Sequence, residues 1–292
     1  MQFTIENHDT SACLSTYGGE MLSFRYKGVE YLWNGDPQFW DRHAPILFPV
    51  VCTPKDLKMA HGGVEYPMPK HGFAIEKEFT PVMQTPARVQ LVLEEDKETL
   101  TMFPFRFRLL VEYAVTEGGF SASFTVTNRD NKPMTYCIGG HPGFRCPMFP
   151  GDDFADYTLV FRNAKGSYVT GTDNGLMAPE LPHLDKIHDN TLDLSYETFA
   201  GDTLIVQDLP DAHVQLIHKK TGHGVDFDFT GFSALGLWTM SEPDEHSPFL
   251  CLEPWNGLPA SSDETTDAKS KKYARTLQPG ESHTVGYRVT VL

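Results

Sequence analysis

Hydrophobic and polar residues alternate with a period of two along most of the chain, a pattern typical of β-strands that are buried on one face. In the segment 107–115 the apolar face consists of Phe107, Leu109, Val111, Tyr113 and Val115. The segment 120–127 alternates in the same way, and Gly118-Gly119 between the two predicts a β-hairpin. The same pattern predicts further strands within 88–96, 213–220, 224–229 and 283–292, and a hairpin over 21–33 that turns at Lys27-Gly28.

Helical periodicity is almost absent from the sequence. No segment keeps a helical pattern for more than about two turns, and only short helical pieces are expected, in 36–43 and 195–199. The polar segment 260–272 is predicted to be an exposed loop. Since the chain has no repeat, low-complexity tract or linker, residues 1–292 are predicted to form a single all-β domain, a large antiparallel β-sandwich.

Composition narrows the class of partner. The formal net charge is -15 at pH 7, and a surface this acidic repels nucleic-acid phosphates and anionic lipids. Five cysteines without a CxxC spacing argue against a disulfide framework or a structural zinc site, and favour reduced thiols in a cytoplasmic protein. Residues 1–19 lack the features of a secretory signal, and no apolar run approaches the ~20 residues that span a bilayer. We therefore expect a neutral small molecule as partner, and neither nucleic acid nor membrane.

Three loop-like stretches combine a titratable side chain with glycine, proline or aromatic residues: "KHGFAIE" with His71, "GGHPGF" with His141, and "CLEPWNGLP" with Glu253. Bare glycine backbone around His141 is expected to let a ligand approach the imidazole closely, although a simple turn histidine has the same appearance. Glu253 follows the apolar run "PFLCL" and is expected to project from a strand end. Trp255 offers an apolar surface for a ring-shaped ligand.

Two histidines and a glutamate suit two kinds of chemistry. As a general acid and base, each positioned group contributes roughly 10²–10⁴-fold to a rate. As ligands, two histidines and a carboxylate form the set found in non-haem iron enzymes. Residues 71, 141 and 253 are widely separated, however, and lack the short His-x-Asp/Glu pair of such sites, so the spacing gives a metal no support.

Five stretches in a fixed order resemble the aldose 1-epimerase (galactose mutarotase) family, in particular its LacX-type branch. They cover roughly 250 residues, and their common order makes the resemblance specific although each stretch alone is weak. The five are "YLWNGDPQFWDRHAPILFPVV" (31–51), "YPMPKHGFA" (66–74), "VTNRDNKPMTYCIGGHPGFRCP" (126–147), "FSALGLWTMSEPDEHSPFLCLEPWNGLP" (232–259) and "LQPGES" (277–282).

The resemblance implies a β-supersandwich with a sugar cleft, and an isomerase that interconverts the α and β anomers of an aldohexose without metal or cofactor. It implies that Glu253 is the base for the C1 hydroxyl and that His141 is the acid for the ring oxygen. It further implies that His71 hydrogen-bonds the sugar near the ring oxygen. Arg42 lies in a segment that carries a substrate-binding arginine in some members, and Asp202 is the match for an aspartate that binds sugar hydroxyls.

Some positions depart from the family pattern. Cys52-Thr53 stand where the branch usually has glycine and arginine, Ile75 where it commonly has arginine, and Ala260 near where an aspartate is expected. The loss of cationic contacts, together with the acidity of the chain, argues against a sugar phosphate as substrate. The departures also leave open a sugar-binding or regulatory protein that kept the cleft and lost useful catalysis.

Overall fold

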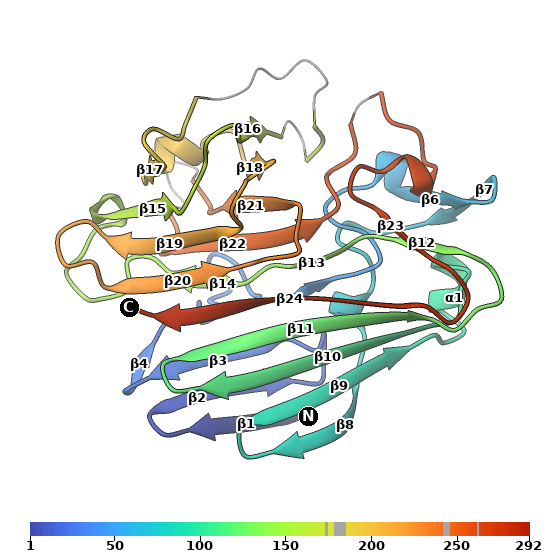
Figure 1. The fold of residues 1–292 in the computed structure, drawn as a ribbon, viewed down its shortest axis with the longest axis horizontal. Helices are drawn as coiled ribbons and strands as arrows, with labels where there is room; N and C mark the ends of the chain where they lie inside the picture. Colours follow the sequence, from blue (N-terminus) through green and yellow to red (C-terminus); the bar gives the residue numbers. More distant parts are fainter. Residues whose placement is uncertain (173–174, 178–184, 242–245, 262) are drawn as a thin grey trace.

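The protein is built around one long antiparallel sheet of nine strands (Figure 1). The computed structural model describes residues 1–172, 175–177, 185–241, 246–261 and 263–292. In spatial order the long sheet contains β17 (Thr191–Asp193), β15 (Tyr157–Phe161), β19 (His213–His218), β20 (Gly224–Asp228), β24 (Ser282–Val291), β11 (Gly119–Asn128), β10 (Phe107–Thr116), β9 (Arg88–Glu94) and β8 (Thr80–Thr85).

Smaller sheets complete the strand structure. A four-stranded sheet contains β1 (Gln2–Asn7), β2 (Thr10–Ser15), β3 (Met21–Tyr26) and β4 (Val29–Glu30). A seven-stranded sheet contains β16 (Tyr168–Gly171), β18 (Leu204–Gln207), β21 (Ala234–Trp238), β22 (Phe249–Asn256), β13 (Ile138–Gly140), β5 (Ile46–Leu47) and, also paired with β22, β14 (Gly143–Arg145). Two-stranded sheets join β6 (Lys58–His61) with β7 (Val64–Pro67), and β12 (Met134–Tyr136) with β23 (Arg275–Leu277).

Helical structure in the described part of the chain is limited to single turns. They are α1 (Thr99–Met102) and the 3₁₀ segments η1 (Lys55–Leu57), η2 (Ala74–Glu76), η3 (Phe154–Asp156), η4 (Tyr196–Phe199) and η5 (Ala268–Ser270). Among the described residues, no helix combines the length and apolar character required to cross a bilayer.

Both larger companion sheets pack on one face of the nine-stranded sheet. At one end Phe24 of β3 meets Phe120 of β11, with ring centroids 4.7 Å apart. At the other end Phe144 of β14 meets Phe227 of β20 at 6.0 Å. Tyr287 of β24 lies between the two contact areas and touches both Phe120 and Phe227, so one core is continuous across the sandwich. This arrangement confirms the predicted large antiparallel β-sandwich.

The alternating segments form the expected strands. β10 and β11 pair in register along their whole length, and the apolar face of β10 is fully buried. Gly119 already belongs to β11, so the hairpin turns at Glu117-Gly118 instead of Gly118-Gly119. The hairpin between β3 and β4 turns at Lys27-Gly28 as predicted, with both residues at positive φ.

Of three local predictions, one is wrong, one is confirmed and one is confirmed in part. Residues 36–43 form turns instead of a helical piece, whereas 195–199 contains η4 as expected. The segment 260–272 is not a uniformly exposed loop. Ala260 and Ala268 are buried, and Lys271 is buried with its ammonium 2.9 Å from Glu264. The described part of this segment is therefore an exposed loop that a few buried residues anchor to the protein.

Candidate active site

The sheet edge beside β22 explains why His141 and Glu253 meet. β13 pairs with the C-terminal end of β22, and β14 pairs with its N-terminal end along the same edge. Between them lies a two-residue break in the ladder, which His141 and Pro142 occupy opposite the middle of β22. Leu252 donates its N–H to the Pro142 carbonyl at 3.1 Å and keeps the break closed. The imidazole therefore lies directly beside Glu253.

The glycines around His141 lie against large aromatic side chains. A Cβ added at Gly139 would lie 2.9 Å from the Trp255 indole, and one at Gly140 would lie 2.8 Å from the Tyr287 ring. A Cβ at Gly143 would lie 3.0 Å from Trp40. This packing is a reason for the glycines that the sequence interpretation did not include. The segment passes between large aromatic side chains that leave no room for a methyl group.

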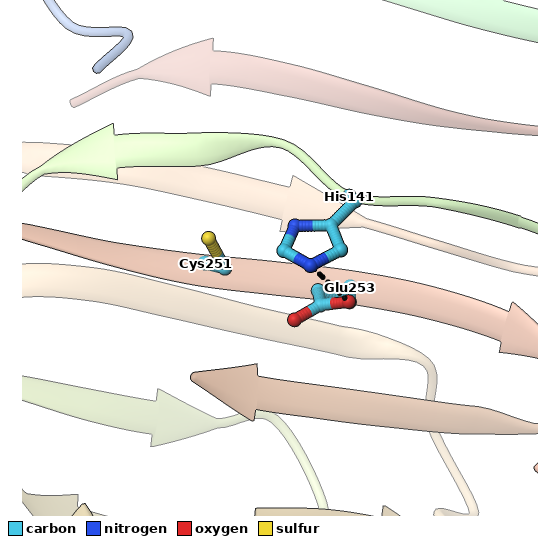
Figure 2. Close-up of side chains that lie close together, drawn as sticks. All are labelled: His141, Cys251 and Glu253. Carbon is cyan, nitrogen blue, oxygen red and sulfur yellow. Dashed lines mark ion pairs between the residues drawn. The ribbon is translucent and has the colours of Figure 1, made fainter. Parts of the chain in front are cut away.

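His141 and Glu253 form a buried pair, with 3.0 Å between Nε2 and Oε2 (Figure 2). His141 is 7% exposed and Glu253 is 1% exposed. Burial lowers the pKa of His141 to about 3, and burial raises the pKa of Glu253 well above its usual range. Both shifts favour the neutral forms, so over a wide pH range the carboxyl group of Glu253 is protonated and the imidazole of His141 is neutral.

His71 lies beside this pair, with its ring centroid 5.4 Å from that of His141. Its backbone is tied to Cys52 and Phe48. His71 donates its N–H to the Cys52 carbonyl at 2.9 Å, and Phe48 donates to the His71 carbonyl at 3.2 Å. Cys52 also donates its backbone N–H to Nδ1 of His71 at 3.2 Å. Because burial lowers the pKa of His71 well below its usual range, the ring is neutral, and its proton lies on Nε2.

Two tryptophans enclose the His141 ring. Trp40 lies against one face, with centroids 4.8 Å apart and planes tilted by 33°. Trp238 meets the ring nearly at right angles at 5.8 Å. The Trp40 carbonyl accepts a hydrogen bond of 2.8 Å from the Trp33 indole, which fixes the loop that carries it. These contacts limit rotation of the imidazole and keep water away from it.

All six residues proposed from the sequence line one cavity of about 330 Å³, namely His71, His141, Glu253, Arg42, Asp202 and Trp255. Its size is at the lower end of the range for small-molecule sites. The sequence hypothesis required these distant residues to converge, and the structure brings them together.

The six residues contribute in different ways. Arg42 is held at the rim, where it donates to the Ile75 carbonyl at 3.2 Å and pairs with Glu76. Asp202 accepts a 2.8 Å hydrogen bond from the Thr172 hydroxyl. Trp255 is 1% exposed, so its indole is mainly a buried floor beneath the cavity.

The placement of Glu253 differs from the prediction in one respect. Glu253 lies inside β22, whose eight residues are all buried, and not at a strand end. It pairs with Gly236 of β21, where an added Cβ would lie 2.4 Å from the Trp255 indole. A carboxyl group inside a buried strand is tolerated here because the cavity and His141 lie beside it.

Sequence reasoning missed three further residues that line the cavity: Lys70, Trp40 and Trp238. Lys70 is exposed, and its positive charge opposes the rise in the pKa of Glu253 that burial causes. Its position next to His71 in the chain was a signal that could have been used. The tryptophans come from segments already quoted for the family resemblance, but nothing local indicates that they face His141.

Among the described residues, the group with metal-ligand spacing is His141, Cys251 and Glu253, whose ligand atoms lie within 4.8 Å of one another (Figure 2). It differs from the set of two histidines and Glu253 that the sequence offered. His71 does not belong to this group. All five cysteines are free, as predicted.

The fold and this site define the class of protein. The family model described as aldose 1-epimerase matches residues 1–290, so the chain belongs to the aldose 1-epimerase family.

Particular relatives lie close in sequence and structure. The chain is 31% identical to the chromosomal LacX protein of Lactococcus lactis subsp. lactis, over 307 aligned positions that cover both proteins completely. It is similar to a galactose mutarotase-like protein from Lactobacillus casei, with 30% identity, a TM-score of 0.93 and full coverage of both chains. A galactose mutarotase related enzyme from Lactobacillus acidophilus has 27% identity and a TM-score of 0.93, with coverage of 100% of this chain and 97% of the other.

Proposed function

We propose that the protein is an aldose 1-epimerase that interconverts the α and β anomers of an aldohexose by general acid–base catalysis. The observation that carries the proposal is the buried contact of 3.0 Å between His141 Nε2 and Glu253 Oε2 at one wall of the cavity. Ring opening requires loss of a proton from the C1 hydroxyl and gain of a proton at the ring oxygen. A carboxylate and an imidazolium side by side supply both transfers, and no metal or cofactor takes part.

In the proposed reaction Glu253 accepts the C1 hydroxyl proton while His141 protonates the ring oxygen. Rotation about the C1–C2 bond of the open-chain aldehyde exposes the other carbonyl face. Closure then runs the two transfers in reverse, so the pair ends the cycle with the same single proton. Since the net reaction moves no proton to solvent, a buried pair suits it.

Neighbouring residues have supporting roles in the proposal. His71 presents Nε2–H as a fixed donor, because its Nδ1 is occupied by Cys52. Arg42 and Asp202 line the cavity, and in the proposal they contact sugar hydroxyls. Lys70 favours the ionised form of Glu253, the form that acts as base.

A second candidate is a sugar-binding or regulatory protein with weak catalysis. One observation favours it. Burial shifts the pKa values of His141 and Glu253 so that the proton rests on Glu253, whereas the reaction starts with the proton on His141. If the bound sugar does not move the proton across the pair, binding occurs without useful turnover.

The test follows anomer exchange by NMR for several aldoses with wild type, Glu253→Gln and the control Glu65→Gln. Glu65 is an exposed carboxylate on the β6–β7 hairpin that pairs with Lys58, so its replacement controls for loss of charge. We expect wild type and the control to accelerate exchange, and Glu253→Gln to be slower by roughly 10²–10⁴-fold. A wild-type protein that adds nothing to the spontaneous rate of any aldose excludes the enzyme. Calorimetric binding of a sugar without acceleration establishes the second candidate.

A further inference from the structure

Cys251 adds a third potential ligand to the His141–Glu253 pair. Residues 251 and 253 are two apart on β22, so their side chains project from the same face of the strand (Figure 2). His141 reaches this face from the break between β13 and β14, and the three ligand atoms lie within 4.8 Å of one another. A nitrogen, a sulfur and an oxygen donor thus converge at the cavity wall.

The polar atoms of this cluster are poorly satisfied within the protein. His141 Nδ1 is buried without a hydrogen-bond partner, and Glu253 Oε2 has only the contact with His141. The Cys251 side chain is completely buried. Buried polar atoms normally have partners, and unpaired ones call for an explanation such as an unoccupied ion site.

We infer that His141, Cys251 and Glu253 form a binding site for a soft divalent cation, with zinc as the best match, and that the bound cation inhibits the enzyme. Three protein ligands and one open position are typical of zinc sites with an exchangeable fourth ligand. The thiolate disfavours magnesium and calcium, which take oxygen ligands. Zinc–ligand distances are about 2.0–2.3 Å. The ligand atoms, now up to 4.8 Å apart, must therefore rearrange around the cation when it binds.

The cation enters through the cavity, because His141 and Glu253 both line it and Cys251 lies beside Glu253 on β22. Binding a divalent cation releases the protons of the thiol and the carboxyl to solvent, and the neutral imidazole coordinates without losing one. Two anionic ligands then balance the charge of the cation, which makes its burial acceptable.

Inhibition is expected because the ligands include the two proposed catalytic residues. This part of the inference rests on the proposed function, whereas the binding of the cation does not depend on it. A coordinated Glu253 accepts no proton from a sugar, and a coordinated His141 delivers none. The cation also occupies the space between them. Zinc bound at this site would therefore switch the enzyme off. In this respect the site differs from a catalytic metal centre, whose metal is required for activity.

Binding is tested with chelator-treated full-length protein titrated with Co²⁺, whose bond to a thiolate gives a near-ultraviolet charge-transfer band. We expect one equivalent to produce the band in wild type and in Cys52→Ser, a matched control because Cys52 lines the same cavity. Cys251→Ser and Cys251→Ala should lose the band. Zinc affinity measured by competition should fall by more than the roughly 10–100-fold typical of an outer-shell change. Absence of the band in wild type, or its survival in a Cys251 variant that folds normally, overturns the site.

Activity gives the second readout. Zinc should suppress anomer exchange by wild type, a chelator should restore it, and each Cys251 variant should resist zinc relative to its own metal-free rate. Protein that becomes inactive on chelation and recovers with zinc overturns the inhibitory role. A Cys251-dependent cobalt band in a protein without epimerase activity keeps the metal site and refutes the proposed function, so the two failures are distinguishable.

Discussion

The opposite pKa shifts of His141 and Glu253 predict an unusual dependence of folding stability on pH. In the unfolded chain Glu253 titrates near 4.5 and His141 near 6.5. In the folded protein burial raises the pKa of Glu253 and lowers the pKa of His141 to about 3. The raised pKa of the Glu253 carboxyl contributes stability that is lost as pH rises. The lowered pKa of the His141 imidazole contributes stability that is lost as pH falls.

The two effects cancel in the middle of the range. Between about pH 4.5 and about pH 6.5 the unfolded pair binds one proton on histidine, and the folded pair binds one on glutamate. The contribution of the pair to the free energy of unfolding is then constant. Above about pH 6.5 only the folded pair keeps a proton, so stability falls by up to about 1.4 kcal/mol per pH unit until the raised pKa of Glu253 is passed. Below about pH 4.5 it falls with a similar slope toward pH 3.

The Glu253→Gln variant isolates this behaviour. Its neutral amide cannot titrate, so its stability should rise up to about pH 6.5 and then stay level, because only His141 remains. The measurement is urea unfolding at several pH values with a chelator present, with Glu65→Gln as control. Lys70 and Asp202 act on Glu253 with opposite signs and are unchanged in the variant. A difference in unfolding free energy between wild type and Glu253→Gln that stays constant from about pH 5 to about pH 8 refutes the raised pKa of Glu253.

Three further substitutions test how the site is supported. Glu20 accepts backbone N–H groups of residues 43 and 44 at 2.6 and 2.9 Å, so Glu20→Ala should cost about 2–5 kcal/mol in urea unfolding by leaving two buried donors unpaired, whereas Glu20→Gln should cost less. Gly72 has φ +76°, and an added Cβ would lie 2.1 Å from the Phe48 carbonyl oxygen. Gly72→Ala should therefore destabilise the protein by more than about 3 kcal/mol. An unchanged midpoint of urea unfolding would contradict this packing. Trp40→Leu should reduce kcat about tenfold or more by freeing the His141 ring, with Trp40→Phe largely restoring it; equal rates for both variants would remove Trp40 from the positioning of His141.

Local alternation was sufficient to predict six strands of the nine-stranded sheet and the β3–β4 hairpin. β10, β11 and β24 expose one face of each strand to the core, so apolar and polar residues alternate along them. The same rule fails for β22, where all eight residues are buried and no alternation marks Glu253 as an interior strand residue. Glu253, which is followed by proline, therefore resembled a residue at a strand end, although it lies inside a central strand of the sheet.

The convergence of His71, His141 and Glu253 was predicted from the family resemblance and not from periodicity or spacing. What brings them together is pairing between distant segments, which no local pattern encodes. The positions of Trp40 against His141 and of Cys251 beside Glu253 depend on the same pairings. Side chains two residues apart on a strand lie on the same face, so residues 251 and 253 are expected to be neighbours. The sequence does not show which histidine they meet, because that depends on the break between β13 and β14.

The break in the ladder beside β22 also limits how this part of the chain can change. Hydrogen bonds of Gly139 and Ile138 with β22 hold one side, and those of Gly143 to Arg145 hold the other. The paired residues on both sides leave no loop that could accommodate an inserted or deleted residue. Such a change would move the imidazole away from the carboxyl group or break the pairing of one short strand with β22. Length variation in related chains should therefore accumulate elsewhere, and this two-residue span should keep its length even where its neighbours differ.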